Sequence, residues 1–329
     1  MSATAVRSDT LLEVRDLRVV YREEGRFVPI VDGVSFSLRR GEALGLAGES
    51  GCGKTTTALA LMGLLPSGLG RTRGEIVLNS KRGVMLLHRR TPTGWRDVRW
   101  KTASMVFQGA MNSLDPVMRI DRQIAEAIRL HEPGANPDAR VNELLERVGI
   151  PATRRRQYPH EFSGGMRQRV MIALALACGP ELMIGDEPTT ALDVMTQGQI
   201  LHLLEELRRD LGLALLLITH DLSVIAETCD RVAIMYAGQI AEQGPVRDLI
   251  ENPQHPYTAR LLRGFSHIGG PRTLGEAIPG SPPHPGENFP GCRFAPRCHL
   301  AFDDCVKAPI PLVKGSDGRE ARCLLAKLP

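Results

Sequence analysis

The chain has 329 residues, 43% of them hydrophobic and 24% charged, so it can form one large domain or two modest domains with a buried core. Its net charge of +4 does not indicate a nucleic-acid-binding protein, in which clustered basic residues are typical. No apolar run reaches the ~18–20 residues of a membrane-spanning helix, and the polar segment 1–9 does not resemble a signal peptide. We therefore expect a cytoplasmic protein that acts at a membrane only through partner subunits.

The first part of the chain predicts strands that lead into a glycine-rich loop. Segments 11–21 and 34–38 are rich in β-branched residues and partly alternate between apolar and polar, which is typical of strands. The apolar run 42–47 enters the loop, and segment 55–64 reads as a helix. Strand, glycine-rich loop and helix in this order are the context that a phosphate-binding loop requires.

The loop itself fills every fixed position of the pattern G-x-x-x-x-G-K-[ST]. Its glycines let backbone N–H groups surround phosphate oxygens, Lys54 brings a positive charge to the β- and γ-phosphates, and the Thr55 hydroxyl can ligate Mg²⁺. A chance glycine turn would not explain a complete pattern between a strand and a helix. The nucleotide contacts expected here are Gly48, Ser50, Gly51, Gly53, Lys54, Thr55 and Thr56.

The middle of the chain, about 95–158, is mostly helical in pattern. Segments 122–130 and 139–148 carry apolar residues at helical spacing. A Glu-Pro-Gly sequence at 132–134 breaks the pattern between them. We therefore expect two helices here, joined by a turn.

A Ser-Gly-Gly sequence opens the next helix, which contains the apolar stretch 170–178. The first turn of a helix has unpaired N–H groups and the positive end of the helix dipole, so Ser163, Gly164 and Gly165 can form an anion site. In isolation, an ordinary serine N-cap explains the same residues. Both interpretations are open at this point.

From residue 181 onward short apolar strands alternate with helices, which is typical of a mostly parallel sheet flanked by helices. The segments are strands 182–185 and 214–219, helices 197–210 and 222–228, and a closing hairpin of 232–235 and 239–243. The first of these strands runs into two carboxylates. Asp186 at its tip can hold magnesium through a water, and Glu187 can polarise the attacking water. Paired acids after a strand are also common as helix N-caps, but a phosphate loop in the same chain favours catalysis.

The chain becomes rich in glycine and proline after residue 262, and four cysteines follow. These are Cys292, Cys298, Cys305 and Cys323. In a reducing cytosol such a cluster indicates a metal site more than disulfides. The spacing C-x5-C-x6-C-x17-C differs from the short C-x2-C pairs of most structural zinc sites. One [4Fe–4S] cluster, a zinc ion, and unligated or reversibly oxidised thiols therefore all stay open.

Four motifs in this order resemble the nucleotide-binding domain of ABC ATPases. They are the phosphate loop, Ser163-Gly-Gly-Met-Arg-Gln-Arg, Asp186-Glu187, and Thr190-Ala-Leu-Asp193. The resemblance implies a P-loop NTPase α/β fold, with a RecA-like mostly parallel sheet, an antiparallel β subdomain and a helical subdomain at about 95–178. We expect an ABC ATPase domain at 1–265 and an irregular C-terminal extension at 266–329.

The resemblance also implies roles for single residues. Tyr21 would stack on the adenine, although a strand tyrosine is commonly just packing, and Gln108 would sense Mg²⁺ and contact the membrane subunits. Asp193 would lie in the loop that crosses the dimer interface. Glu187 and His220 would be catalytic, with His220 at the γ-phosphate rather than merely a hydrogen-bonded strand end. The implied magnesium ligands are Thr55, Gln108 and Asp186.

In ABC ATPases two such domains meet head to tail, and each ATP lies between one phosphate loop and the other domain's Ser-Gly-Gly helix. This chain has one phosphate loop and one such helix, so it needs a second ABC ATPase subunit, usually a paralogue. The resemblance implies two transmembrane permease subunits and an extracytoplasmic substrate-binding protein as further partners. It places the chain at the cytoplasmic face of the cell membrane, with no nucleic-acid partner.

The tail narrows the branch of the family. Asn252-Pro-Gln-His-Pro-Tyr, Ile278-Pro-Gly and Gly291-Cys-Arg-Phe-Ala-Pro-Arg-Cys resemble the C-terminal extension of oligopeptide and dipeptide importer ATPases. This branch also includes importers of nickel and glutathione, and some of its members are thought to carry an iron–sulfur cluster. The resemblance therefore implies an ATPase that drives peptide import, with those small solutes as alternatives.

Two other classes of ABC protein are disfavoured. Soluble ABC ATPases that act on DNA or the ribosome usually carry a long coiled-coil insertion or two tandem cassettes, and this sequence has neither. A degenerate, regulatory subunit without motor function would not be expected to keep Lys54, Asp186, Glu187 and His220.

Overall fold

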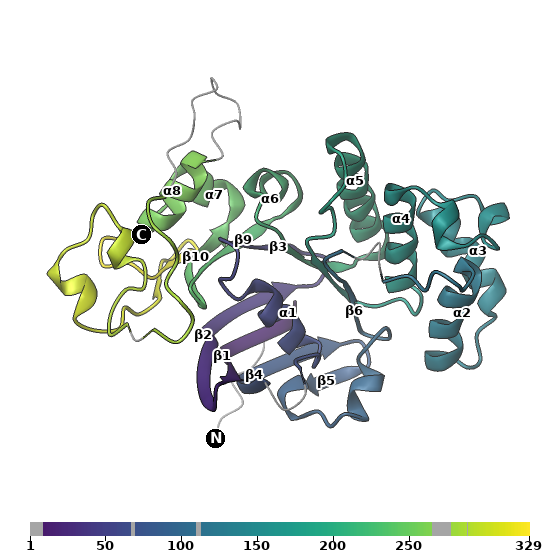
Figure 1. Cartoon of the computed structure of the whole chain (residues 1–329), viewed down its shortest axis with the longest axis horizontal. Coiled ribbons are helices and arrows are strands. Elements are labelled where there is room, and N and C mark those ends of the chain that lie inside the picture. The colour runs from purple at the N-terminus through teal and green to yellow at the C-terminus, as the bar shows by residue number, and fades with distance from the viewer. Residues whose placement is uncertain (1–8, 67–69, 110–112, 265–277, 288) are drawn as a thin grey trace.

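The computed structural model of the chain describes residues 9–66, 70–109, 113–264, 278–287 and 289–329. Two sheets meet at the centre of the molecule, and helices α5 and α6 lie on one side of the larger sheet (Figure 1). The helices are α1 (Lys54–Leu61), α2 (Ile120–His131), α3 (Pro137–Arg147), α4 (Gly164–Ala175), α5 (Val194–Leu211), α6 (Leu222–Thr228), α7 (Val246–Glu251) and α8 (Pro256–Gly264).

The smaller sheet is antiparallel, with strand order β2-β1-β4-β5. Its strands are β1 (Thr10–Glu23), β2 (Arg26–Arg39), β4 (Gly70–Ser80) and β5 (Gly83–Leu86). Leu12 and Val14 are buried, and so are Leu17 and Val19 after a register shift in β1; within each pair the spacing is the period of two expected when one face of a sheet is packed. The two strands predicted at 11–21 and 34–38 are confirmed, and both are longer than predicted.

The larger sheet has the order β11-β12-β10-β9-β3-β8-β7-β6. Its strands are β3 (Ala43–Ala47), β6 (Ala103–Val106), β7 (Leu182–Asp186), β8 (Ala214–Ile218), β9 (Arg231–Tyr236), β10 (Gln239–Pro245), β11 (Val313–Lys314) and β12 (Glu320–Ala321). From β9 to β6 the strands are parallel, and every residue of β3, β7 and β8 is buried, as expected for a sheet covered on both faces. The predicted mostly parallel sheet is confirmed, and so is the hairpin, in which Gln239 pairs with Tyr236.

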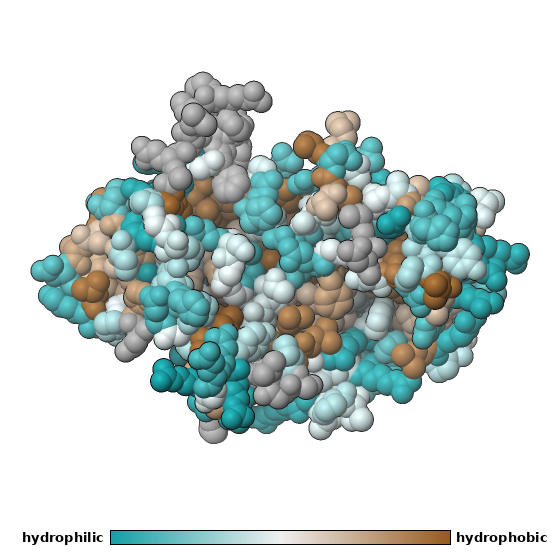
Figure 2. Space-filling view, in the orientation of Figure 1, coloured by the Kyte–Doolittle hydropathy of each residue, from teal (hydrophilic) through white to brown (hydrophobic). Residues whose placement is uncertain are grey.

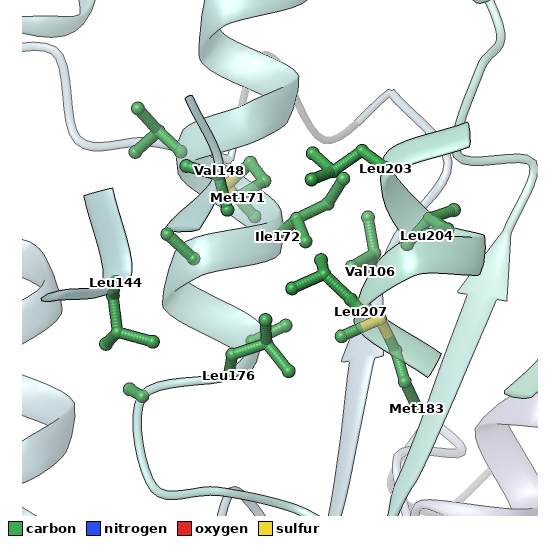
Figure 3. Packing of buried hydrophobic residues seen from close by; sticks show 14 of the residues in the cluster. Val106, Leu144, Val148, Met171, Ile172, Leu176, Met183, Leu203, Leu204 and Leu207 are labelled. Atoms are coloured by element: carbon green, nitrogen blue, oxygen red, sulfur yellow. The ribbon is translucent and has the colours of Figure 1, made fainter. Parts of the chain in front are cut away.

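Helices α2, α3, α4 and α5 share one apolar core, shown in Figure 3. Its members include Val106, Leu144, Val148, Met171, Ile172, Leu176, Leu203, Leu204 and Leu207. The two predicted helices at 122–130 and 139–148 correspond to α2 and α3. Pro137 opens α3, and the Asn136 side chain accepts hydrogen bonds from Asp138 N at 3.1 Å and Ala139 N at 3.4 Å, a standard helix start.

The expectation that 95–158 is mostly helical is wrong at its beginning. Ala103–Val106 forms β6 at the edge of the larger sheet, parallel to β7, and the first α-helix of this segment starts at Ile120. Four buried residues, three of them apolar, are too few for their periodicity to separate a strand from a buried helix turn. Pairing with β7 decides the structure, so the helical part of this region begins later than residue 95.

The C-terminal extension returns to the larger sheet. Its strand β12 pairs with β10, with Ala321 opposite Glu242, and Phe294 packs against the rings of Tyr236 and Tyr257 with centroids 5.2 and 5.3 Å away. The extension lies at the end of the molecule opposite α2 and α3 (Figure 1). The predicted domain boundary at 265/266 lies outside the described residues, and so does the first part of the predicted Gly/Pro-rich linker, up to residue 277. The described part of that linker, 278–287, contains no helix or strand.

The surface carries mixed residue types. In Figure 2 the apolar residues of the visible face lie in small patches among polar ones. Of the helices in the described ranges, none combines the length and hydropathy needed to cross a bilayer.

Candidate nucleotide-binding and catalytic site

The phosphate loop connects β3 to α1 and is pressed against the rest of the molecule at two glycines. A Cβ on Gly48 would lie 2.1 Å from the Met235 carbonyl oxygen, and one on Gly53 would lie 2.9 Å from the Ile30 carbonyl oxygen. Both glycines also have positive φ, +148° and +104°, a conformation that side chains rarely adopt. The loop therefore has the close backbone approach that its glycine pattern predicts.

Lys54 is held inside its own loop. The side chain is buried, and its Nζ donates hydrogen bonds to the carbonyl oxygens of Gly48 at 2.7 Å and Glu49 at 3.0 Å. These bonds keep the ammonium group over the loop, where a phosphate oxygen can take the place of a carbonyl. The position fits the role predicted for Lys54.

Thr55 and Asp186 connect the start of α1 to the end of β7. The Thr55 hydroxyl donates to Asp186 Oδ1 at 3.2 Å. Burial raises the pKa of Asp186, and the Thr55 hydrogen bond acts in the opposite direction. A hydroxyl and a carboxylate side by side are ligands that Mg²⁺ accepts together with substrate phosphates, so these two residues can hold the ion that the sequence predicts.

Glu187 is the centre of the polar contacts at this edge of the sheet. Its carboxylate accepts hydrogen bonds from Gln108 Nε2 at 2.8 Å and Thr190 Oγ1 at 2.9 Å, and it lies 3.1 Å from His220 Nδ1. Burial acts to raise the pKa of Glu187, but hydrogen bonds from His220 and Thr190 and the charge of Lys54 outweigh it and lower that pKa. An ionised carboxylate in this position can polarise a water molecule.

The backbone at Glu187 is also unusual. Its φ is +48°, in the left-handed region that non-glycine residues seldom adopt. The Glu187 N–H donates to the Ile218 carbonyl oxygen at 2.8 Å, which ties the residue to the end of β8. Strained residues of this kind cluster at functional sites, so the conformation supports a functional role for this carboxylate.

Ser163, Gly165 and Asp193 form a second group, where α4 meets α5. Ser163 caps α4 by accepting from Met166 N at 3.3 Å, and Asp193 caps α5 by accepting from Thr196 N at 2.9 Å. A Cβ on Gly165 would lie 2.5 Å from Thr196 Cγ2, so the two helix starts are in close contact. The serine N-cap is thus present, and it leaves other N–H groups of the first turn of α4 without helical partners.

Apart from the other phosphate-loop residues and the four cysteines, the sequence-predicted site residues fall into two groups and one outlier. Thr55, Gln108, Asp186, Glu187 and His220 are linked side by side. The residues Ser163, Gly164, Gly165 and Asp193 lie at the starts of α4 and α5, and Figure 1 shows these two helices apart from α1. Tyr21 pairs with Val28 and Gly70 in the antiparallel sheet and packs against its core.

The four clustered cysteines line one small cavity of about 20 Å³. Phe294 and Ile310 also line it. Burial raises the pKa of Cys292, Cys298 and Cys323. Four thiols around one cavity are the donor set of a [4Fe–4S] cluster or a structural zinc ion. Within the described ranges, no three His, Cys, Asp or Glu side chains are already placed to hold a metal ion, so the thiols would have to move toward a shared centre.

Two contacts at the phosphate loop and its neighbours were not predicted from the sequence. Thr190 donates a hydrogen bond to Glu187, and its place three residues after this carboxylate is a local signal that could have found it. Arg297 of the C-terminal extension forms an ion pair with Glu49 of the phosphate loop. The two residues are 248 positions apart, and no local pattern links them.

Comparisons with known proteins agree with these motifs. The family model for ABC transporters matches residues 31–190, and the model for the oligopeptide/dipeptide transporter C-terminal region matches residues 241–305. The oligopeptide transport ATP-binding protein OppD of Salmonella typhimurium is 44% identical over 331 residues, covering 98% of this chain and 97% of OppD. The oligopeptide transport ATP-binding protein AppD of Bacillus subtilis is 44% identical over 321 residues, covering 96% of this chain and 97% of AppD.

A solved structure shows the same fold. The structure of cbiO1 from Clostridium perfringens, part of the ABC transporter complex cbiONQ, aligns with a TM-score of 0.63 and 26% identity. The alignment covers 79% of this chain and 96% of cbiO1. The predicted fold class, a P-loop α/β cassette with an antiparallel β subdomain and a helical region, is confirmed by this likeness and by the sheet order.

Proposed function

The chain belongs to the ATP-binding proteins of ABC transporters, which are ATPases, and we propose that it is the ATP-hydrolysing subunit of a peptide importer. The observation that supports hydrolysis is the position of the Glu187 carboxylate. It contacts His220 and follows Asp186, which is hydrogen-bonded to Thr55 of the phosphate loop. Peptide import is supported by the names of OppD and AppD and by the match to the oligopeptide/dipeptide C-terminal region. Nickel, glutathione and other small solutes are the alternative cargoes.

Each residue of the phosphate loop and of the first group has a role in this proposal. Lys54 contacts the β- and γ-phosphates of ATP, while Thr55, Asp186 and Gln108 hold Mg²⁺, whose charge offsets that of the phosphates. Glu187 orients and polarises the attacking water, because its pKa is lowered and it can accept a hydrogen bond. His220 fixes the Glu187 carboxylate and faces the γ-phosphate. The remaining loop contacts are Gly48, Ser50, Gly51, Gly53 and Thr56.

The second group faces a partner. We infer a head-to-tail pair of ATPase subunits, in which Ser163, Gly164 and Gly165 bind the partner's ATP and Asp193 lies at the interface. Val194 and Met195, beside Asp193, are 84% and 76% exposed, and so large an apolar exposure at a helix start is typical of a contact surface. The partner subunit is a paralogue in this proposal. Within this chain's own nucleotide site, Tyr21 stacks on the adenine.

The subunit pair requires a membrane component. Two permease subunits and an extracytoplasmic substrate-binding protein complete the proposed importer, with the chain bound peripherally at the cytoplasmic face. The region around Gln108 would transmit ATP-driven movement to the permeases. The ATPase domain at 1–265 supplies the motor, and the extension at 266–329 carries Cys292, Cys298, Cys305 and Cys323, which we propose to hold one [4Fe–4S] cluster, with zinc as the alternative.

The test is ATP hydrolysis by the chain co-expressed with its permeases, with candidate peptides and the binding protein added or omitted. We expect peptide to stimulate hydrolysis, and Glu187→Gln to bind ATP but lose at least about 100-fold in turnover, since general bases contribute roughly 10²–10⁴-fold. Nickel and glutathione serve as competing cargoes in the same assay.

Glu206→Gln is the matched control. Glu206 also pairs with a histidine, His202 at 3.3 Å, but on the exposed surface of α5, so its removal should leave the rate unchanged. An unchanged rate in Glu187→Gln would assign turnover to the partner's site and make this chain a regulatory half. Co-purification with ribosomes or nucleic acid in place of permeases would contradict the transport role.

A further inference from the structure

Glu49, the second residue of the phosphate loop, has three groups that are each bound by a different part of the chain. Its N–H donates to the Tyr257 hydroxyl at 3.0 Å, and its carbonyl oxygen accepts from Lys54 Nζ at 3.0 Å. Its carboxylate accepts two bonds from Arg297, at 2.7 and 3.0 Å. Through this one residue the C-terminal part of the chain is connected to the lysine that binds phosphate.

The Arg297 side chain is held in place by several contacts other than the one with Glu49. It is only 9% exposed, and besides the carboxylate it donates to the Tyr236 hydroxyl at 3.2 Å and to the carbonyl oxygens of Pro279 at 2.9 Å and Gly280 at 3.2 Å. A guanidinium with all these acceptors has one orientation, and a bidentate pair with a carboxylate adds geometric specificity. The ion pair therefore restricts where the Glu49 side chain can lie.

Tyr257 is equally immobile. Its side chain is fully buried, with its ring 4.6 Å from that of Tyr236 and 5.3 Å from that of Phe294, centroid to centroid. Three packed aromatic rings form a rigid base, so the hydroxyl that accepts the Glu49 N–H is held at a fixed place. The loop is thus held from α8 as well as from the extension.

The negative charge of Glu49 is the reason that its contacts with Arg297 and Tyr257 affect nucleotide binding. A carboxylate in a phosphate loop repels the phosphates that the loop collects. Burial raises the pKa of Cys52 inside the loop, and the negative charge of Glu49 acts in the same direction. Arg297 neutralises it and holds it to one side. Without Arg297 the negative charge is uncompensated and the carboxylate is free to turn toward the triphosphate or toward Lys54.

We propose that Arg297 and Tyr257 are positioning residues for the phosphate loop, which hold Glu49 so that ATP affinity depends on the C-terminal extension. The inference rests on the proposed function, because it assumes that this loop binds ATP. Neither residue needs to touch the nucleotide. Both act on Lys54 and on the backbone of the loop through Glu49.

The test is titration of the full-length chain with a fluorescent ATP analogue, alongside melting temperatures without nucleotide. Arg297→Ala should weaken binding about tenfold, the scale of one hydrogen-bonded charge pair. Glu49→Gln should stay within about twofold of wild type. The double variant should regain most of the loss, because the uncompensated charge is gone. Arg297→Lys keeps the positive charge but cannot make two parallel hydrogen bonds to the carboxylate, so its ATP affinity should lie between those of wild type and Arg297→Ala.

Arg319→Ala is the matched control. Arg319 is also a buried arginine of the extension, and it pairs with Asp317 at 2.5 Å, so its loss should lower the melting temperature without weakening ATP binding. Equal affinity in wild type and Arg297→Ala would overturn the proposal, and so would a double variant as weak as Arg297→Ala. Wild-type chain that fails to bind ATP would instead overturn the proposed function, and this inference with it.

Discussion

At the scale of single residues, buried His255 ties stability to pH. Its Nδ1 accepts the Tyr257 N–H at 3.0 Å, so the ring is neutral in the folded chain, and burial lowers its pKa from 6.5 to about 4, helped by the charge of Arg322. Between pH 6.5 and 4 the unfolded chain takes up a proton that the folded chain refuses. The stability from neutral His255 is therefore full above pH 6.5 and is lost as the pH falls, by about 2 kcal/mol at pH 5.

His255→Asn isolates this effect. Asparagine keeps a side-chain acceptor for the Tyr257 N–H at the start of α8 but does not titrate, so the variant should lose less stability than wild type between pH 7.5 and 5. Urea unfolding at the two pH values measures the difference. His202→Asn, at an exposed histidine, should lose as much stability as wild type between the two pH values. Parallel pH dependence in wild type and His255→Asn would refute the assignment.

At the scale of elements, the contact between α4 and α5 depends on the missing side chain of Gly165. A Cβ there would lie 2.5 Å from Thr196 Cγ2, so in Gly165→Ala either the Thr196 side chain must leave its place beside Asp193 or the two helix starts must move apart. Overpacking of this kind costs about 1–3 kcal/mol, more than the roughly 1 kcal/mol that alanine contributes to a helix relative to glycine. We expect a net loss of stability in denaturant unfolding.

Two further variants make the prediction specific. Thr196→Ser removes the clashing methyl group but keeps the hydroxyl that donates to Asp193 Oδ2 at 2.7 Å, and it should restore most of the stability of Gly165→Ala. Gly198→Ala, in the same helix α5, meets nothing within 4 Å and should stabilise the chain by up to about 1 kcal/mol. If Gly165→Ala is as stable as Gly198→Ala, the helices do not touch as described.

The same scale shows what the sequence could and could not predict. The strand β7 and the helix α5 have local signals, an apolar run that ends in carboxylates and a long amphipathic pattern. β6 has no such signal, because its four residues, three of them apolar, become a strand only by pairing with β7. The residues of the phosphate loop could be predicted from the spacing of their sequence motif, and the roles assigned to them stay predictions. The Arg297–Glu49 pair was not readable, since only the folded chain brings the two residues together.

At the scale of the whole molecule, the C-terminal extension has little core of its own. Its described residues bury Phe294, Ala295, Ile310 and Ala321 among apolar side chains, and its strands β11 and β12 have two residues each. Segments with so small a core usually need a disulfide or a metal to stay folded. The four cysteines meet at one cavity inside this extension, which is where such a link would act.

Metal analysis of the full-length chain, purified without oxygen, tests the link. One [4Fe–4S] cluster would give about four iron and four sulfide per chain, with thiolate-to-iron absorption, whereas a structural site would give one zinc. Cys305→Ser should reduce the metal content and speed hydrogen exchange in 289–329, while α2 and α3 at the far end of the molecule keep their protection (Figure 1). Cys178→Ser, at a buried cysteine outside the extension, should change neither the metal content nor the hydrogen exchange of 289–329. A chain without iron or zinc, whose exchange is unaffected by Cys305→Ser, would show that the aromatic cluster and the β10–β12 pairing hold the extension by themselves.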